Sequence, residues 1–375
     1  MKKALFVATY GDFFTSFLLD KIGIVKRFGY TVVCAANFEK SEYNRSTDQL
    51  RALGVKTVHL PFARSPYSFS NFKAYRELKR VIGREAPAFV DCHNPVAGAL
   101  TRLAVGKNFS GVVAYTAHGF FFYKGAPLKN RILYKPIERF LALRTDVLIT
   151  MSEEDFLAAK KMRVKKAVEL VHGMGVEVQK TETSDEFRAE KRKELGLEKD
   201  EFVAVCVGEC IPRKNQKTAL KAFASPLLKS AKLLFVGAGE DLPKLKEYAK
   251  RLGIADRIVF TGYRKDVREI LKAVDLFLFP SFQEGLSVAL LEAMAAGLPV
   301  VGADIRGNRD CIEQGRGGLL YPPTDDEGFA KGLYLFRSDS ELCKVTGEWN
   351  RERVNDFSKA QVRKEYERIY RKFLP

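Results

Sequence analysis

The chain has 375 residues, of which 46% are hydrophobic and 29% charged, a composition that excludes disordered, collagen-like and disulfide-scaffold proteins. Its length predicts two domains. The net charge is +17, and residues 1–178 hold 28 basic against 15 acidic side chains, so the excess lies in the first half. A basic surface in solution and an anionic membrane face both stay open, whereas nucleic acid is disfavoured because no zinc spacing, heptad or RNA-binding motif accompanies the charge.

The start of the chain and its cysteines indicate a cytoplasmic protein. Residues 1–7 could begin a signal peptide, but the apolar stretch stops at residues 10–12 and no cleavage site follows. No apolar run approaches the roughly 18 residues that a membrane helix needs. The six cysteines form no C-x-x-C pair and lie mostly in apolar runs, which predicts reduced core residues.

Short β-rich runs alternate with helical segments through the first half. Residues 4–9 predict a strand, 14–28 a helix ended by Gly29, and 30–35 a second strand. Further strands are predicted at 88–91, 112–116, 146–150 and 168–171. This βαβ rhythm implies a parallel sheet that is covered on both faces.

The rhythm stops at residues 179–200, which predict a polar linker and a short helix, and it then restarts. Strands are predicted at 202–207, 232–236, 257–260, 276–279, 299–303 and 318–320. The tail begins with a capping-box pattern at 358–361, followed by a basic amphipathic helix. The predicted fold is therefore α/β, with two doubly wound Rossmann-like domains (1–176 and 177–355) facing across a cleft and a C-terminal helix (356–375) packing back on the first. Ligands of such sheets bind at the carboxyl ends of the strands.

The strongest motif is the segment 280–300, which reads PSFQEGLSVALLEAMAAGLPV. It predicts a strand end, a loop with Glu284 and Gly285, and a helix from 287 to 296 whose N-terminus suits a phosphate. Glu284 and Glu292 are eight residues apart, about 12 Å along a helix, too far to act on one atom. They suit the two ends of a sugar nucleotide. The alternative is two surface carboxylates, which the apolar neighbours of Glu292 disfavour.

This pattern resembles the Glu-x7-Glu signature of glycosyltransferase family 4, the retaining sugar-nucleotide transferases of GT-B fold. Other segments agree with the family in order along nearly the whole chain. They are YTAHGF at 115–120, VGECIPRKNQ at 207–216, FVGAGE at 235–240 and FTGYRKDV at 260–267. HNPVAG at 93–98 and SEED at 152–155 are similar to the bacterial exopolysaccharide and capsule branch.

Single residues in these segments have a physical reason and an alternative. Lys214 follows a strand, where a cation can neutralise a diphosphate whose charge grows in the transition state; alone it would be a surface lysine. The family usually has Arg where this chain has Glu209, and Arg213 can supply the missing cation. His118 ends a strand, where a structural histidine is the alternative. The resemblance implies that it contacts a hydroxyl of the donor sugar or a carbonyl neighbour, not that it is a general base.

The resemblance assigns catalysis to His118, Glu284, Lys214 and Arg213, and donor binding to Gly11, Gly208, Gly262, Tyr263, Gly285, Leu286, Ser287 and Glu292. Gly11 is otherwise a plain turn glycine. We expect no metal and no other cofactor, because the chain has no metal-ligand spacing and no Asp-x-Asp. Gly237-x-Gly239 lacks the third glycine of a dinucleotide fingerprint and indicates a turn.

Four consecutive aromatic residues, 120–123, precede a predicted basic helix at 129–144. They predict either a loop anchored in the core or a loop that touches a membrane or the acceptor, because aromatic residues beside lysines suit a lipid interface.

The resemblance implies retaining transfer of a sugar from a UDP-sugar to a hydroxyl of a polyprenyl-diphosphate-linked saccharide, in exopolysaccharide or capsule biosynthesis. The enzyme would be peripheral at the inner face of the cell membrane. Two alternatives stay open: a sugar-nucleotide epimerase of similar fold, and an inactive membrane-bound scaffold, for which Glu209 is the only support.

Overall fold

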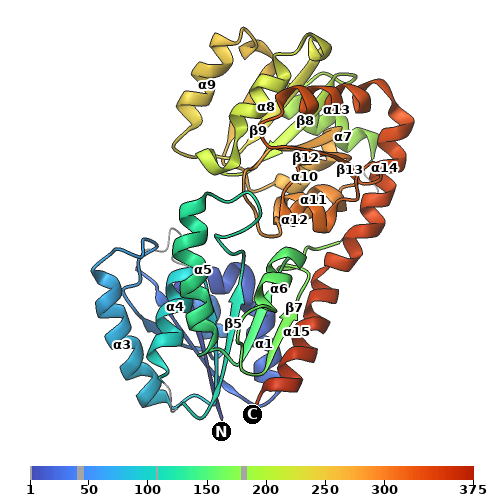
Figure 1. Cartoon of the computed structure of the whole chain (residues 1–375). Helices are drawn as coiled ribbons and strands as arrows, with labels where there is room; N and C mark the ends of the chain where they lie inside the picture. The colour runs from blue at the N-terminus through green and yellow to red at the C-terminus, as the bar shows by residue number, and fades with distance from the viewer. Residues whose placement is uncertain (1, 40–45, 107–108, 179–183) are drawn as a thin grey trace. The chain divides into compact units, whose positions relative to one another are not determined.

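The computed structural model describes residues 2–39, 46–106, 109–178 and 184–375. They form two compact units (Figure 1). Unit 1 comprises residues 1–173 and 362–375, and unit 2 comprises residues 174–361. Residues 179–183, at the start of the predicted linker, lie outside the described part of the chain.

Unit 1 is built on a seven-stranded parallel sheet with the strand order β3-β2-β1-β4-β5-β6-β7. The edge strand β3 was not predicted, because its four residues are exposed or half-buried and form no apolar run. The strands are β1 (Lys3–Tyr10), β2 (Thr31–Asn37), β3 (Lys56–His59), β4 (Phe89–His93), β5 (Val112–Ala117), β6 (Val147–Thr150) and β7 (Ala167–Leu170).

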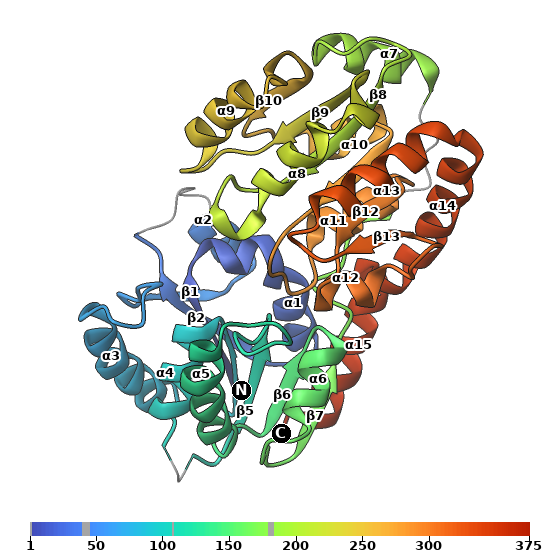
Figure 2. The ribbon, with the colours of Figure 1, turned by 45° about the horizontal axis from the view of Figure 1, so that its top comes forward.

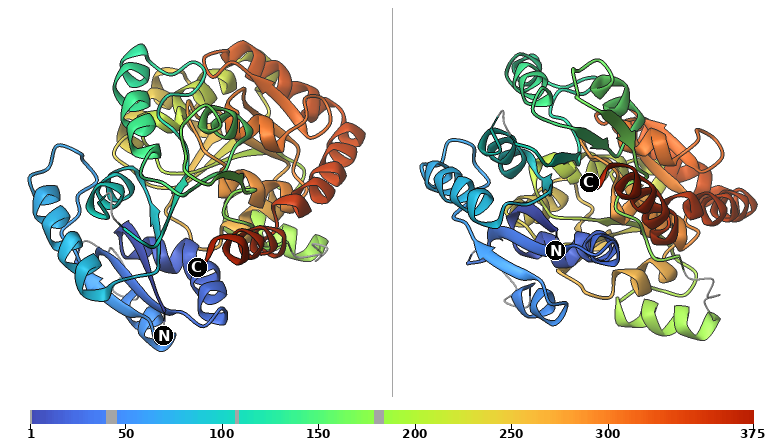
Figure 3. Two further views of the ribbon diagram at one scale, coloured as in Figure 1. Left: turned by 60° about the horizontal axis from the view of Figure 1, so that its bottom comes forward. Right: turned by 90° about the horizontal axis from the view of Figure 1, so that it is seen from below.

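Helices cover both faces of this sheet. One face carries α3 (Ser70–Glu85), α4 (Pro95–Ala104), α5 (Leu128–Ala142) and α6 (Glu153–Ala159). The other face carries α15 (Lys359–Phe373) beside α1 (Leu19–Arg27), with Lys21 over the ring of Tyr366 at 4.9 Å (Figure 3). The helix predicted at 14–28 begins as the π-helical turn η1 (Phe14–Leu18), and α2 (Ser46–Ala52) precedes β3. The predicted cap of the last helix is present, since the amide of Gln361 donates to Ser358 Oγ at 3.2 Å.

Unit 2 repeats the pattern on a six-stranded parallel sheet with the order β10-β9-β8-β11-β12-β13. Its strands are β8 (Phe202–Val207), β9 (Ala231–Val236), β10 (Ile258–Gly262), β11 (Leu276–Phe279), β12 (Val300–Ala303) and β13 (Gly318–Tyr321). One face packs against α8 (Gln216–Phe223), α9 (Leu242–Arg251) and α13 (Asp326–Ser338) (Figure 2). The other packs against α10 (Val267–Ala273), α11 (Val288–Ala295) and the short turn η5 (Val354–Phe357). The elements α7 (Asp185–Glu194), α12 (Arg306–Cys311) and α14 (Ser340–Arg353) complete the unit.

The strand order reverses once in each sheet, between β1 and β4 in unit 1 and between β8 and β11 in unit 2. At such a reversal the following helices lie on opposite faces, which opens a crevice at the carboxyl ends of the two strands. The loops after β8 and β11 are therefore the first place to look for a ligand site in unit 2. The loops after β1 and β4 are the corresponding place in unit 1.

The aromatic segment 120–123 is anchored in the core of unit 1. Phe120 and Phe122 are buried and their rings stack at 4.7 Å, while the ring of Phe121 lies 4.9 Å from Tyr134 on α5. The interpretation of this segment as a membrane-touching loop is therefore wrong for its two buried rings. The six cysteines are free thiols, five of them buried, as the sequence predicts.

Candidate active site

The loop after β8 is held in place by Asn215. The chain leaves β8 through Gly208, forms the short 3-10 helix η2 (Pro212–Lys214) and reaches Asn215, whose backbone is left-handed (φ 56°). The side-chain amide of Asn215 donates from Nδ2 to the carbonyl oxygen of Pro280 at 2.9 Å and to that of Pro323 at 2.8 Å. Asn215 is buried, so these bonds fasten the β8 loop to the start of the β11 loop and to the loop after β13.

Three of the four residues predicted to be catalytic meet in this crevice. Glu284, in the loop after β11, is 9% exposed. Its Oε1 lies 2.8 Å from Lys214 Nζ and 3.0 Å from Arg213 Nη1. Two cations beside one carboxylate give this cluster a net charge of about +1, which favours binding of an anion.

The start of α11 borders this cluster. Ser287 is the N-cap residue of α11, and its side chain makes no capping hydrogen bond with the described residues. The first amides of the helix are thus available to an anion, which the helix dipole also favours. Leu286 packs against the core of unit 2.

Helix α12 supports the loop that carries Glu284. Arg306, buried on α12, donates from Nε to the carbonyl oxygen of Glu284 at 3.0 Å. A Cβ atom at Gly307 would overlap the carbonyl oxygen of Gly285, so only glycine allows α12 to approach the loop this closely. The predicted glycine at 285 therefore has a structural partner that the sequence did not reveal.

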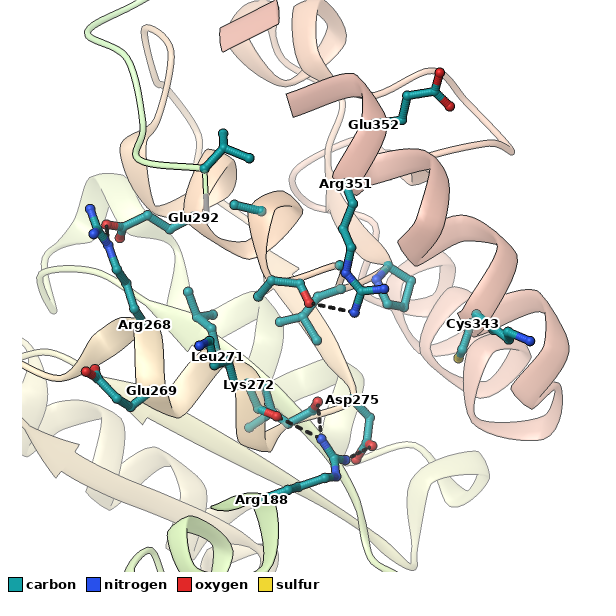
Figure 4. A pocket seen from close by; sticks show the side chains of 18 of the residues that line it. Arg188, Arg268, Glu269, Leu271, Lys272, Asp275, Glu292, Cys343, Arg351 and Glu352 are labelled. Atoms are coloured by element: carbon teal, nitrogen blue, oxygen red, sulfur yellow. Dashed lines mark hydrogen bonds and ion pairs between the residues drawn. The ribbon is translucent and has the colours of Figure 1, made fainter. Parts of the chain in front are cut away.

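Glu292 lies apart from the cluster, on the next turns of α11. Its Oε1 accepts a hydrogen bond from Arg268 Nε on α10 at 3.0 Å. The pair borders a cavity of about 1130 Å³ within unit 2, and in Figure 4 Arg268 reaches toward Glu292 at the edge of this cavity. Arg188, which also lines the cavity, is paired with Asp275 at 2.6 Å.

Gly262 and Tyr263 lie at the carboxyl end of β10, on the same edge of the sheet but separated from β8 by β9. Gly262 has a positive φ of 71°, and its carbonyl oxygen accepts a hydrogen bond from the amide of Gly237 at 2.9 Å. The Tyr263 side chain is 62% exposed. The Tyr263 ring is therefore not packed in the core. It is accessible for stacking against a flat ligand group.

The remaining predicted residues, Gly11 and His118, belong to unit 1. A Cβ atom at Gly11 would overlap the ring of Phe38, so packing alone requires glycine there. His118 follows β5, and its Nε2 lies 3.2 Å from Nδ1 of His93 at the end of β4. Burial lowers the pKa of His118 well below its usual value, and His93 and Lys21 add to this effect. His118 is therefore a neutral ring at neutral pH, suited to hydrogen bonding and not to ion pairing.

Sequence reasoning missed five residues of these two sites. Their sequence context gave only weak indications of a role. Asn215 follows a basic pair, and His93 comes just after a predicted strand. Arg306 and Gly307 follow a strand, and Arg268 lies on an amphipathic helix.

Comparison with known proteins covers both units. Residues 187–353 match the family described as "Glycosyl transferases group 1", and residues 25–171 match "Glycosyl transferase 4-like domain". The whole chain is 35% identical over 381 residues to the protein named "Putative glycosyltransferase EpsD" of Bacillus subtilis strain 168, of which the alignment covers 97%. It is also 28% identical, over 89% of this chain and 86% of the relative, to the Escherichia coli UDP-Gal:alpha-D-GlcNAc-diphosphoundecaprenol alpha-1,3-galactosyltransferase.

A solved structure shares the fold. The crystal structure of Anabaena HepE in complex with UDP superposes with a TM-score of 0.80 at 18% sequence identity, over 99% of this chain and 100% of that one. Together with the two doubly wound sheets, this likeness confirms the predicted fold class.

Proposed function

Because the chain belongs to glycosyltransferase family 4, we propose that it moves a sugar from a UDP-sugar to a hydroxyl of a saccharide acceptor, with retention of the anomeric configuration. The observation that carries this proposal is the cluster of Lys214 and Arg213 around Glu284, at the strand-order reversal of unit 2 and beside the start of α11. The positive charge of this cluster and the available amides at the start of α11 favour an anion such as a nucleoside diphosphate.

In the proposed reaction the bond between the anomeric carbon and the diphosphate oxygen breaks, and the acceptor oxygen forms the new bond on the same face. The acceptor proton passes to the leaving phosphate oxygen, and the products are UDP and the glycoside. Lys214 and Arg213 stabilise the charge that develops on the diphosphate. They are already held in place by Glu284, so little reorganisation is needed in the transition state.

The other residues bind the donor. Glu284 and the amides from Gly285 to Ser287 bind the sugar and its phosphate, and Glu292 accepts hydrogen bonds from the ribose hydroxyls. Glu292 can do so beside Arg268, because a carboxylate has two oxygens and about four acceptor positions. His118 contacts the donor sugar. Two cations and a helix N-terminus supply the positive charge, so the reaction needs no divalent metal.

The acceptor in this proposal is a saccharide on a polyprenyl diphosphate, in the biosynthesis of a cell-surface polysaccharide such as an exopolysaccharide or a capsule. The name of the Escherichia coli relative states an acceptor of this type, and a second relative is EpsD. An enzyme with a lipid-linked acceptor must work at a membrane surface. None of the described helices is both long and apolar enough to cross a bilayer, so we propose peripheral association with the inner face.

The outer side of α5 is the surface that we assign to this contact. The helix is exposed along most of its length, and with the residue after its end it presents six large apolar side chains that are 44–69% exposed. Exposed basic side chains alternate with them, which suits an interface with anionic lipid. The apolar residues are Leu128, Ile132, Leu133, Ile137, Phe140 and Leu143; the basic ones are Lys129, Arg131, Lys135 and Arg139.

Binding and turnover test the chemistry. UDP and the matching UDP-sugar should raise the melting temperature of the full chain by mass action, and the sugar should appear on a polyprenyl-diphosphate-linked saccharide. Conversion of the UDP-sugar to another UDP-sugar without any acceptor would show the epimerase instead. A chain that binds no UDP-sugar would refute the proposal.

Vesicle sedimentation tests the membrane contact. The full chain should bind phosphatidylglycerol vesicles at low salt and release at high salt, with little binding to phosphatidylcholine. The double substitution Ile132→Ser and Phe140→Ser should weaken binding at least about 10-fold, since it removes two exposed apolar side chains. The matched control substitutes Tyr334→Ser and Val345→Ser, which are exposed on unit 2. Equal binding of both double variants would remove α5 from the interface.

A further inference from the structure

A row of buried polar side chains in unit 1 leads to His118 and has no part in the chemistry above. Asp91 and His93, both on β4, are 0% exposed. The hydroxyl of Tyr370, on α15, donates to Asp91 Oδ2 at 2.5 Å. Asp91 Oδ1 lies 3.3 Å from His93 Nε2, and His93 Nδ1 lies 3.2 Å from His118 Nε2.

The strand geometry explains why these groups meet. Side chains alternate across a sheet, so Asp91 and His93 point to one face while Cys92, between them, packs into the core of the other face. On β5, Tyr115 and Ala117 also belong to that other core, so His118 emerges on the same side as His93. The α15 helix covers this side and brings Tyr370 to Asp91.

The neighbouring atoms restrict where the protons can be. Asp91 Oδ1 and His93 Nε2 are buried and have no hydrogen-bond partner in the described part of the chain, although they lie 3.3 Å apart. Leaving both unpaired is unfavourable, and a proton on His93 Nε2 that points at the carboxylate satisfies both. A neutral His93 then has its lone pair on Nδ1, which must accept a hydrogen bond from His118.

We propose that His93, oriented by Asp91, is a positioning residue that holds His118 in the form protonated on Nε2. His118 then offers its other nitrogen, Nδ1, as a hydrogen-bond acceptor. The group that it recognises is therefore a donor, a sugar hydroxyl, and not a carbonyl oxygen. The identity of the ligand as a sugar rests on the proposed function, whereas the protonation pattern does not. The lowered pKa of His118 agrees with a neutral ring.

Nuclear magnetic resonance of histidine nitrogens tests the protonation pattern directly. The chain has four histidines, so a long-range ¹H–¹⁵N spectrum of the labelled full chain is simple to assign. The variant His59→Gln, at an exposed histidine outside the row, removes one set of signals. We expect His118 and His93 both to carry their proton on Nε2. A proton on Nδ1 of His118 in the wild-type protein would overturn the proposal.

Asp91→Asn is the matched perturbation. The hydroxyl of Tyr370 donates to this side chain, so the new amide turns its oxygen to Tyr370 and its nitrogen to His93 Nε2. The amide then donates to His93, so His93 carries its proton on Nδ1 and donates to His118, and the proton of His118 moves to Nδ1. This inversion should appear in the spectrum of a variant that still melts cooperatively. Tyr370→Phe, which leaves Asp91 and His93 in place, should keep the wild-type pattern. A folded Asp91→Asn variant with unchanged His118 signals would also overturn the proposal.

Turnover supplies the second readout. With the native UDP-sugar, Asp91→Asn should lower kcat/KM about 3- to 10-fold, the value of one neutral hydrogen bond. With the deoxy analogue that lacks the recognised hydroxyl, wild type and variant should be equal. If the variant is impaired by the same factor with the native donor and with every deoxy donor, its defect is only structural, and the positioning role is refuted. Absence of any transfer by the wild-type protein would refute the proposed function and leave the spectroscopic result standing.

Discussion

Replacing Lys214 with alanine should separate catalysis from stability. The Lys214 and Glu284 side chains are 13% and 10% exposed and their charged atoms lie 2.8 Å apart, a charge-assisted pair normally worth about 1.5–3 kcal/mol. Arg213 stays on the same carboxylate oxygen at 3.0 Å, so Glu284 is not left without a cation. The loss of stability should therefore be about 1 kcal/mol, or 2–4 °C in Tm.

The loss of activity should be much larger. In the proposed reaction, Lys214 faces the diphosphate whose charge grows in the transition state, and removing one such group costs about 2.7–4 kcal/mol, or 100- to 1000-fold in kcat. Donor affinity should fall far less. Steady-state transfer, calorimetric UDP binding and thermal melts on the same preparations measure the three quantities.

Two matched variants serve as comparisons for this prediction. Lys217→Ala removes an exposed lysine in the first turn of α8 and should leave turnover and UDP binding unchanged. Its effect on Tm should be small, because Lys217 only lies over the ring of Tyr248 at 5.0 Å. Arg213→Ala removes the more exposed cation and should cost less than Lys214→Ala. If Lys214→Ala lowers kcat/KM less than about 10-fold, Lys214 is only the counter-ion of Glu284 and the assignment is refuted.

Three further predictions concern the donor site, the metal and the sheet of unit 1. Glu292→Gln should weaken UDP binding about 10- to 100-fold by calorimetry without changing the fold, because the ribose loses a charged acceptor, whereas Glu269→Gln in the same cavity should not. Transfer should persist in excess EDTA; complete loss that magnesium or manganese restores would contradict the metal-free mechanism. Hydrogen bonds from Lys56 and also from Lys3 hold the pKa of buried Glu85 at about 2, against a usual 4.5. This stabilisation is fully present above pH 4.5 and is lost as the pH falls toward 2, so Glu85→Gln should destabilise unit 1 by about 1–2 kcal/mol at pH 7 and little at pH 2, in contrast to the half-buried control Glu77→Gln, whose ion pair with Lys73 is 4.0 Å long.

The two parallel sheets and most of the proposed donor loops could be predicted from local sequence patterns. Apolar runs of strand length alternating with helical segments are such a pattern, so twelve of the thirteen strands in the described residues could be located from them. Loops at strand ends are equally local, which is why Glu284 and Gly285 could be named from their strand–loop–helix segment, and Lys214 with the help of the family resemblance. The edge strand β3 could not be predicted in this way, because its four residues are exposed or half-buried and form no apolar run.

Which of these residues contact one another could be seen only in the tertiary structure. The pairing of Lys214 and Arg213 with Glu284 joins segments about 70 residues apart, and it depends on the hydrogen bonds of Asn215 to two other loops. The approach of Tyr370 to Asp91 spans 279 positions. Such contacts arise from strand order and helix packing, and no local pattern encodes them.

Burial was the other property that the local pattern left open. The aromatic rings at 120 and 122, which composition alone could place at a membrane, lie inside unit 1, while α5 and the residue after it turn six apolar side chains outward. Phe120 and Phe122 pack into the core on the face of the sheet that α5 covers, whereas the six exposed side chains lie on the side of α5 away from that core. The sequence thus determined the chemistry available at each strand end, and the packing of the strands determined which groups share a site and which face the solvent.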